Sequence, residues 1–193
     1  AICIMGDRGV GKTTLMCQRL LEEYKSVEQA LYISADNIVV ESKGLFRIAQ
    51  EYFSYGGEAL FIDEVHKYPN WSIEIKNILD TYKKNKVVFS ASSSLDLNQS
   101  KADLSRRVVY YTLQGLSFRE YINISQDRRL PSYTFSEILQ DHVKLTEGLS
   151  SIKPLKLFKE YLSYGYYPFY LEGQEDYLLK LNNVIEKVIF EDI

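Results

Sequence analysis

Cysteine clusters, excess basic charge and long apolar runs are all missing from this sequence. Its 193 residues include two cysteines, Cys3 and Cys17, and neither belongs to a Cys-x-x-Cys pair or a Cys/His cluster. This usage argues against a zinc site and is typical of two reduced thiols. No run approaches the roughly 20 apolar residues that span a membrane, and no signal peptide is recognisable. We therefore expect a cytoplasmic protein without a membrane segment.

The charge balance argues against a domain built to bind nucleic acid. The formal net charge is −3, whereas such domains normally carry a basic surplus that contacts phosphates. We therefore expect nucleic-acid binding only through domains outside this sequence. The chain opens on the apolar run Ala1–Met5 and ends in the helical pattern Leu178–Phe190, so we expect a fragment of a longer protein, cut at both ends.

The first part of the sequence alternates short apolar runs with helical patterns. The runs, which suit strands buried on both faces, are Ala1–Met5, Ala30–Ser34, Ala59–Asp63, Lys86–Ala91 and Val108–Leu113. Helical periodicity appears between them at Lys12–Tyr24, Leu45–Phe53 and Ile73–Tyr82. This alternation predicts an α/β fold in which helices cover both faces of a mostly parallel sheet, a three-layer sandwich.

Helical patterns dominate after Leu113. They cover Leu116–Ile124, Phe135–Thr146, Leu155–Tyr164 and Tyr177–Phe190. We place a boundary at Gln114–Gly115, which predicts an α/β domain at 1–114 and a small α-helical domain at 115–193. The second part also contains a cluster of tyrosines, which we expect to pack helices together, with a partner-binding surface as the alternative.

The strongest motif is Gly6–Thr14, whose sequence GDRGVGKTT fits the phosphate-binding pattern G-x-x-x-x-G-K-[ST]. It lies between a predicted strand and an amphipathic helix, where backbone N–H groups and the helix N-terminus can surround phosphate oxygens. Lys12 is expected to contact the β- and γ-phosphates, as a catalytic group too, and Thr13 is expected to bind Mg²⁺. The predicted nucleotide-binding residues are Gly6, Asp7, Arg8, Gly9, Val10, Gly11, Lys12, Thr13 and Thr14. The alternative is a glycine-rich surface turn.

A second motif is the apolar run that ends in the acidic pair Asp63-Glu64. Ligands in open α/β sheets bind at the carboxyl ends of the strands, so Asp63 is expected to face the phosphate-binding loop. Asp63 would hold Mg²⁺ through its water shell, and Glu64 would orient and polarise the attacking water. A solvated turn is the alternative for this pair.

Three further side chains are candidates for supporting roles. In the run Ser90–Ser94, we favour Ser92 as a catalytic sensor of the γ-phosphate, with helix capping as the alternative. Arg107, or its neighbour Arg106, is a candidate arginine finger, with a salt bridge or a helix C-terminal cation as the alternative. His66 is expected to be a polar neighbour of the acidic pair rather than a metal ligand.

The run FIDEVHKYPNWSIEIKNILD resembles the LDEIQ-x-x-P-x-W stretch of a prokaryotic group of AAA-type ATPases, which commonly carry an uncharacterised C-terminal domain. The segments GDRGVGKTTL, LYISAD, VVFSASSS, LSRR, LQGLSFREY and YLSYGYYP are similar in the same order. The resemblance implies an AAA+-like P-loop fold with sheet order 5-1-4-3-2 and a helical lid. It also implies the roles given above for Lys12, Thr13, Asp63 and Glu64, a sensor near Ser92 and an arginine finger near Arg107.

The expected ligands are ATP and Mg²⁺, with ADP as product. A guanine-reading motif is missing, because Asn85-Lys86 is followed by Val87-Val88. We expect an ATPase that drives conformational change in an attached domain or partner. A homo-oligomer in which a neighbour supplies the finger in trans is among the expected partners. The alternatives are a regulatory nucleotide switch with negligible turnover and a P-loop small-molecule kinase, against which the Asp63-Glu64 pair argues.

Overall fold

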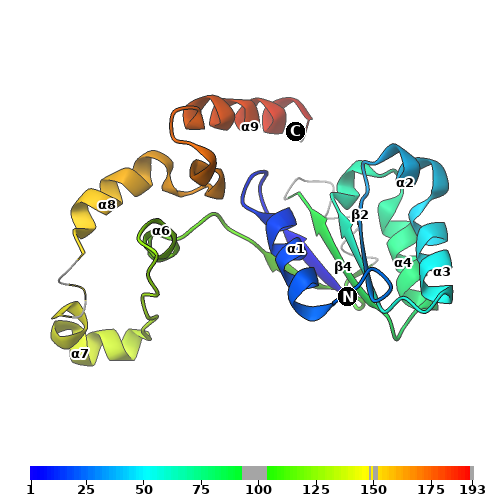
Figure 1. The fold of residues 1–193 in the computed structure, drawn as a ribbon, viewed down its shortest axis with the longest axis horizontal. Coiled ribbons are helices and arrows are strands. Elements are labelled where there is room, and N and C mark those ends of the chain that lie inside the picture. The colour runs from blue at the N-terminus through cyan, green and yellow to red at the C-terminus, as the bar shows by residue number, and fades with distance from the viewer. Residues whose placement is uncertain (93–103, 148, 150–151, 192–193) are drawn as a thin grey trace. The chain divides into compact units, whose positions relative to one another are not determined.

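The computed structural model describes residues 1–92, 104–147, 149 and 152–191 (Figure 1). They form two compact units, one of Ala1–Gln114 with Leu181–Ile193 and one of Gly115–Lys180. The predicted domains, 1–114 and 115–193, stay a prediction, because compactness does not test whether either part folds alone. Within the described residues, no helix combines the length and the apolar character that crossing a membrane requires.

A parallel five-stranded sheet forms the centre of the first unit. Its strands are β1 (Ile2–Met5), β2 (Ala30–Ser34), β3 (Ala59–Asp63), β4 (Lys86–Ala91) and β5 (Val109–Thr112). They lie in the order β2-β3-β4-β1-β5, and every neighbouring pair is parallel. This confirms the predicted order 5-1-4-3-2, counted from the other edge. All residues of β3 are buried, which explains why that strand is a continuous apolar run.

Helices cover both faces of this sheet, which confirms the predicted three-layer α/β fold (Figure 1). Helix α1 (Lys12–Glu23) lies on one face, and α2 (Ile38–Lys43), α3 (Leu45–Ser54) and α4 (Trp71–Thr81) lie on the other. Successive residues of β3 enter different cores, because side chains of a strand alternate between its faces. Phe61 packs with Met16 of α1, whereas Leu60 and Ile62 pack with Ile75 of α4.

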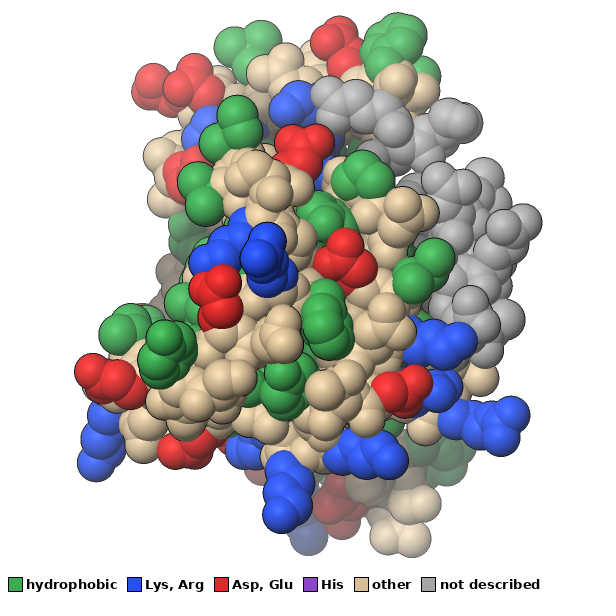
Figure 2. All heavy atoms as spheres, turned by 90° about the vertical axis from the view of Figure 1, so that its right-hand side faces the viewer, with side chains coloured by type: hydrophobic (Ala, Val, Ile, Leu, Met, Phe, Trp, Pro, Cys, Tyr) green, Lys and Arg blue, Asp and Glu red, His purple; other side chains and the backbone are tan. Residues whose placement is uncertain are grey.

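Helix α2 is the element that periodicity does not predict. It has six residues, and its first two side chains, Ile38 and Val39, are exposed while Val40 is buried. An apolar stripe cannot be recognised in a helix this short whose exposed positions are themselves apolar. The outer face over α2, α3 and α4 is shown in Figure 2, where charged side chains of both signs are interspersed with single hydrophobic ones.

The second unit is built from short helices, as predicted. They are α6 (Phe118–Ser125), α7 (Phe135–Glu147), α8 (Pro154–Glu160), the π-helical turn η2 (Tyr161–Gly165) and the 3₁₀ turn η3 (Pro168–Glu172), while α9 (Tyr177–Glu191) continues beyond the unit. Helix α6 begins later than its apolar pattern because Ser117 and Glu120 form a capping box. The buried Tyr121 packs against the rings of Tyr161 and Tyr170.

Candidate nucleotide-binding site

The loop between β1 and α1 has the backbone of a phosphate-binding turn. Gly9 and Gly11 adopt φ angles of 86° and 98°, which side-chain-bearing residues rarely adopt. Gly11 is the N-cap, so α1 begins at Lys12. The first N–H groups of a helix have no acceptor within the helix and carry partial positive charge. The loop therefore presents donors suited to an anion such as a phosphate group.

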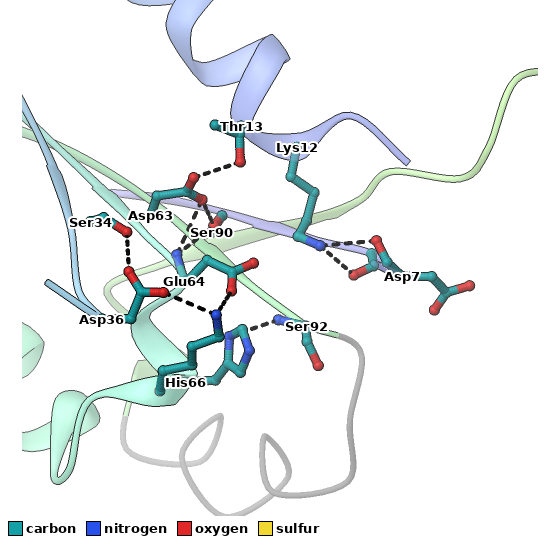
Figure 3. A network of polar contacts seen from close by, with 12 residues as sticks. Asp7, Lys12, Thr13, Ser34, Asp36, Asp63, Glu64, His66, Ser90 and Ser92 are labelled. Atoms are coloured by element: carbon teal, nitrogen blue, oxygen red, sulfur yellow. Dashed lines mark hydrogen bonds and ion pairs between the residues drawn. The ribbon is translucent and has the colours of Figure 1, made fainter. Parts of the chain in front are cut away.

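The ammonium group of Lys12 lies inside this loop. Only 6% of Lys12 is exposed, and its Nζ donates to the carbonyl oxygens of Gly6 at 2.9 Å and Asp7 at 3.0 Å (Figure 3). Burial lowers the pKa of Lys12, and the carboxylates of Glu64, Asp63 and Asp7 offset part of that shift. The lysine is thus a shielded cation held between the loop and the acidic pair.

Gly6 has no room for a side chain. A Cβ atom there would lie 2.4 Å from the carbonyl oxygen of Leu113, which follows β5. We expect Gly6→Ala to lower the free energy of unfolding by about 3 kcal/mol, since the backbone must shift to relieve the overlap. Chemical denaturation without nucleotide measures this. Gly56→Ala is the control, because Gly56 also has a positive φ but no atom within 4 Å of such a Cβ, and it should cost about 1 kcal/mol. Equal costs would contradict the close approach.

Asp63 ends β3 and accepts hydrogen bonds from three other elements. Its Oδ2 accepts from Thr13 Oγ1 at 2.6 Å and from the Tyr32 hydroxyl at 2.8 Å, and its Oδ1 accepts from Ser90 Oγ. Tyr32 and Ser90 belong to β2 and β4, the two neighbours of β3. The carboxylate therefore lies at the carboxyl edge of the sheet, beside the start of α1 (Figure 3).

The side-chain oxygen atoms of Thr13 and Asp63 are suitable ligands for a magnesium ion. Both residues offer oxygen atoms, and Mg²⁺ in nucleotide sites usually takes one or two protein oxygens and completes its octahedron with water and phosphate. Among the described residues, no cluster of three or more His, Cys, Asp or Glu side chains could hold a metal.

Glu64 directly follows β3 in a left-handed conformation, with φ 55° and ψ 39°. Its backbone N–H donates to Asp63 Oδ1 at 3.1 Å and to Ser90 Oγ at 2.9 Å. Among the carboxylates that raise the pKa of Lys12 against burial, Glu64 contributes most. Such a conformation is uncommon outside glycine and is found at functional sites. In this conformation the negative charge of Glu64 raises the pKa of Lys12 in the phosphate-binding loop.

Two polar residues at the site go beyond the predicted set. Tyr32 falls inside a strand pattern, and Ser90 begins the run Ser90–Ser94, in which the sequence favours Ser92. Ser90 is fully buried against Asp63, whereas the backbone N–H of Ser92 donates to Nδ1 of His66 at 3.2 Å. His66 therefore contacts the residue that follows β4. The other predicted serines, Ser93 and Ser94, lie outside the described residues. A polar side chain near the end of a buried strand is the signal that could have found Tyr32 and Ser90.

Arg107 lies at the amino ends of the strands, whereas the phosphate-binding loop lies at their carboxyl ends. Arg107 precedes β5, and its carbonyl oxygen accepts from the amino group of Ala1, which precedes β1, at 3.3 Å. Its guanidinium group donates to both carboxylate oxygens of Asp80, near the end of α4, at 2.7 and 3.0 Å. These hydrogen bonds lower the pKa of Asp80. The amino and carboxyl ends of the strands are a strand length apart, so Arg107 does not reach the loop of its own chain.

Two solved structures resemble the described fold. The Orc1 protein of Aeropyrum pernix in complex with DNA has a TM-score of 0.46 and 16% sequence identity, covering 65% of this chain and 42% of that one. The Hsp104–ADP complex of S. cerevisiae has a TM-score of 0.46 and 20% identity, covering 64% and 21%.

Sequence comparison adds a relative and a family. Uncharacterized protein MJ1637 of Methanocaldococcus jannaschii is 28% identical over 212 residues, a match that covers all of this chain and 43% of that protein. This chain thus spans less than half the length of that relative. The model of an AAA domain matches residues 1–122, more than half of the chain and all of the sheet and site described above. The chain therefore belongs to the AAA domain family of P-loop ATPases, which indicates a nucleotide-binding, ATPase-like function.

Proposed function

We propose that this chain binds ATP with Mg²⁺ and hydrolyses it to ADP and phosphate. The observation that carries the proposal is the meeting of two motifs that lie far apart in the sequence. Thr13 Oγ1 donates to Asp63 Oδ2 at 2.6 Å, and Glu64 directly follows Asp63, with its backbone N–H donating to Asp63 Oδ1 at 3.1 Å. The carboxyl ends of the strands thus bring together three proposed parts of the site. They are the phosphate-binding loop, two oxygens that would bind a metal, and a carboxylate that would polarise water.

Each residue has a task in the proposed reaction. The N–H groups of Gly6–Thr14 and the ammonium of Lys12 bind the triphosphate, and Thr13 and Asp63 hold the magnesium ion. When bound, this ion neutralises charge on the phosphate oxygens. Glu64 accepts a hydrogen bond from the attacking water and polarises it. Ser92, which follows β4 at the same edge of the sheet, is the proposed γ-phosphate sensor.

The proposed reaction drives conformational change in an attached domain or a partner. This chain covers 43% of its relative from Methanocaldococcus jannaschii, so any attached domain belongs to sequence outside this chain. We further propose a homo-oligomer in which Arg107 of one copy acts on the nucleotide of the next. Arg107 lies at the amino ends of the strands. This position supports action in trans, because from there the side chain cannot contact a nucleotide bound to the loop of its own chain.

Phosphate release from ATP, measured with Mg²⁺ and again with EDTA, tests this function. Lys12→Ala is expected to weaken ATP–Mg binding by about 100-fold, because charge-assisted hydrogen bonds to phosphate contribute about 1.5–3 kcal/mol each. Isothermal calorimetry measures the affinity. The control is Lys43→Ala, an exposed lysine that pairs with Glu51, which should bind ATP as the unmodified protein does. Tight binding by Lys12→Ala would contradict the site, and ATP binding without phosphate release would identify a nucleotide-dependent switch.

A further inference from the structure

We propose that Lys67 is a positioning residue that holds the Glu64 carboxylate in its working orientation. The inference rests on the proposed function, because it gives Lys67 a role only if Glu64 acts on water. Lys67 Nζ lies 2.6 Å from Glu64 Oε2 and 3.0 Å from Asp36 Oδ2. One ammonium group therefore joins the proposed catalytic carboxylate to a second carboxylate, in the turn that follows β2.

The contact with Lys67 supplies what the backbone of Glu64 lacks. Hydrogen bonds to Asp63 and Ser90 fix the N–H group of Glu64, but its side chain still has three rotatable bonds. The 3₁₀ turn η1 (Val65–Lys67) brings Lys67 back over Glu64 as an i,i+3 pair. Lys67 contacts one carboxylate oxygen, and in Figure 3 the other oxygen of Glu64 points away from Asp36, toward the side on which Lys12 lies. That second oxygen is the one available to a water molecule.

The lysine is itself anchored to the neighbouring strand. Ser34, the last residue of β2, donates from its Oγ to Asp36 Oδ1 at 2.5 Å, and Asp36 Oδ2 accepts from Lys67. Ser34 is paired with Asp63 in the sheet register. The chain of contacts from Ser34 through Asp36 and Lys67 to Glu64 therefore spans the carboxyl ends of β2 and β3, and it ties the orientation of Glu64 to two strands at once.

Stability alone is a poor explanation of these contacts. The side chains of Lys67, Glu64 and Asp36 are 33%, 22% and 43% exposed, and ion pairs at such sites typically contribute about 0–1 kcal/mol to folding. A carboxylate that is displaced by a fraction of an ångström, in contrast, loses its alignment with water and phosphate. Loss of Lys67 should therefore affect turnover rather than folding.

The test compares Lys67→Met, Lys67→Arg and the control Lys43→Met, an exposed lysine whose ion-pair partner is Glu51 on α3. We expect Lys67→Met to lower kcat about tenfold with KM for ATP–Mg changed less than about twofold, the pattern of an interaction that matters in the transition state. Lys67→Arg should restore most of kcat, and Lys43→Met should leave it unchanged. All three variants should melt at the temperature of the unmodified protein.

A double-mutant cycle separates this inference from the proposed function. If Lys67 acts through Glu64, then adding Lys67→Met to Glu64→Gln should lower the residual rate no further. If Glu64→Gln alone is inactive while Lys67→Met turns over at the original rate or faster, the role of Lys67 is overturned and the proposed function stands. If Glu64→Gln is fully active, the proposed role of Glu64 fails, and the role of Lys67 fails with it. A lower melting temperature with equal losses for methionine and arginine would show a structural role and overturn the inference.

Discussion

Glu64→Gln is expected to retain ATP–Mg binding and to lower the rate of hydrolysis by about 1000-fold, within the range of a lost general base. Glutamine keeps the shape of glutamate and leaves the Glu64 N–H free to bond Asp63 and Ser90 as before. It removes the charge that polarises water. Calorimetry should therefore show ATP affinity within a few-fold of the original, while a phosphate-release assay shows the loss.

The contrast with Asp63→Asn sharpens this result. Asp63 accepts from Thr13 and Tyr32, and its proposed task is to hold the metal rather than to act on water. Its replacement should thus weaken the Mg²⁺ dependence of ATP binding, which Glu64→Gln should leave intact. Hydrolysis by Glu64→Gln at the unmodified rate would remove Glu64 from the mechanism.

Arg107→Ala is expected to lower hydrolysis by about 1000-fold without changing ATP affinity, because an arginine finger stabilises charge that develops in the transition state. Arg107 precedes β5 and the phosphate-binding loop follows β1, so they lie at opposite ends of two neighbouring parallel strands. The loss should therefore appear under conditions in which turnover per chain rises with protein concentration. The exposed neighbour Arg106 is the matched control, and Arg106→Ala should stay active. The pair with Asp80 is exposed to solvent, so its loss should leave the melting temperature nearly unchanged.

Mixing two inactive variants provides the sharper test of action in trans. Arg107→Ala retains Glu64, and Glu64→Gln retains Arg107. In a mixed oligomer some sites would combine an intact Glu64 with a neighbour's intact Arg107, so activity should reappear on mixing. Turnover that is independent of concentration, together with no recovery in the mixture, would contradict the proposed finger.

The sheet could be predicted because its signal is local. The predicted bounds of β2, β3 and β4 agree with the structure, since strands buried on both faces are short apolar runs that stand out from their surroundings. The start of α1 agrees as well, because the glycines before it adopt conformations that end the strand and leave the helix to begin at Lys12. Helix α2 has no such local signal.

The contacts within the site could be predicted only in part. The meeting of Thr13 with Asp63 follows from parallel topology, which brings strand ends to one edge. The hydrogen bonds that Tyr32 and Ser90 donate to Asp63 depend on the register of β2 and β4 against β3, and register is set by pairing rather than by local pattern. The roles of Ser92 and Arg107 stay predictions.

The hydroxyl of Thr13 donates a hydrogen bond to Asp63, and this has a consequence for the order in which the ligands bind. The oxygen of that hydroxyl keeps lone pairs for a dication, while Asp63 would contact the ion through its water shell, so the protein by itself offers the ion few direct ligands. Free Mg²⁺ would lose hydration water and gain few protein ligands in return, whereas a bound triphosphate adds its own oxygens as ligands of the ion. We therefore expect the metal and the nucleotide to bind together as ATP–Mg, and we expect the protein to have little affinity for Mg²⁺ alone.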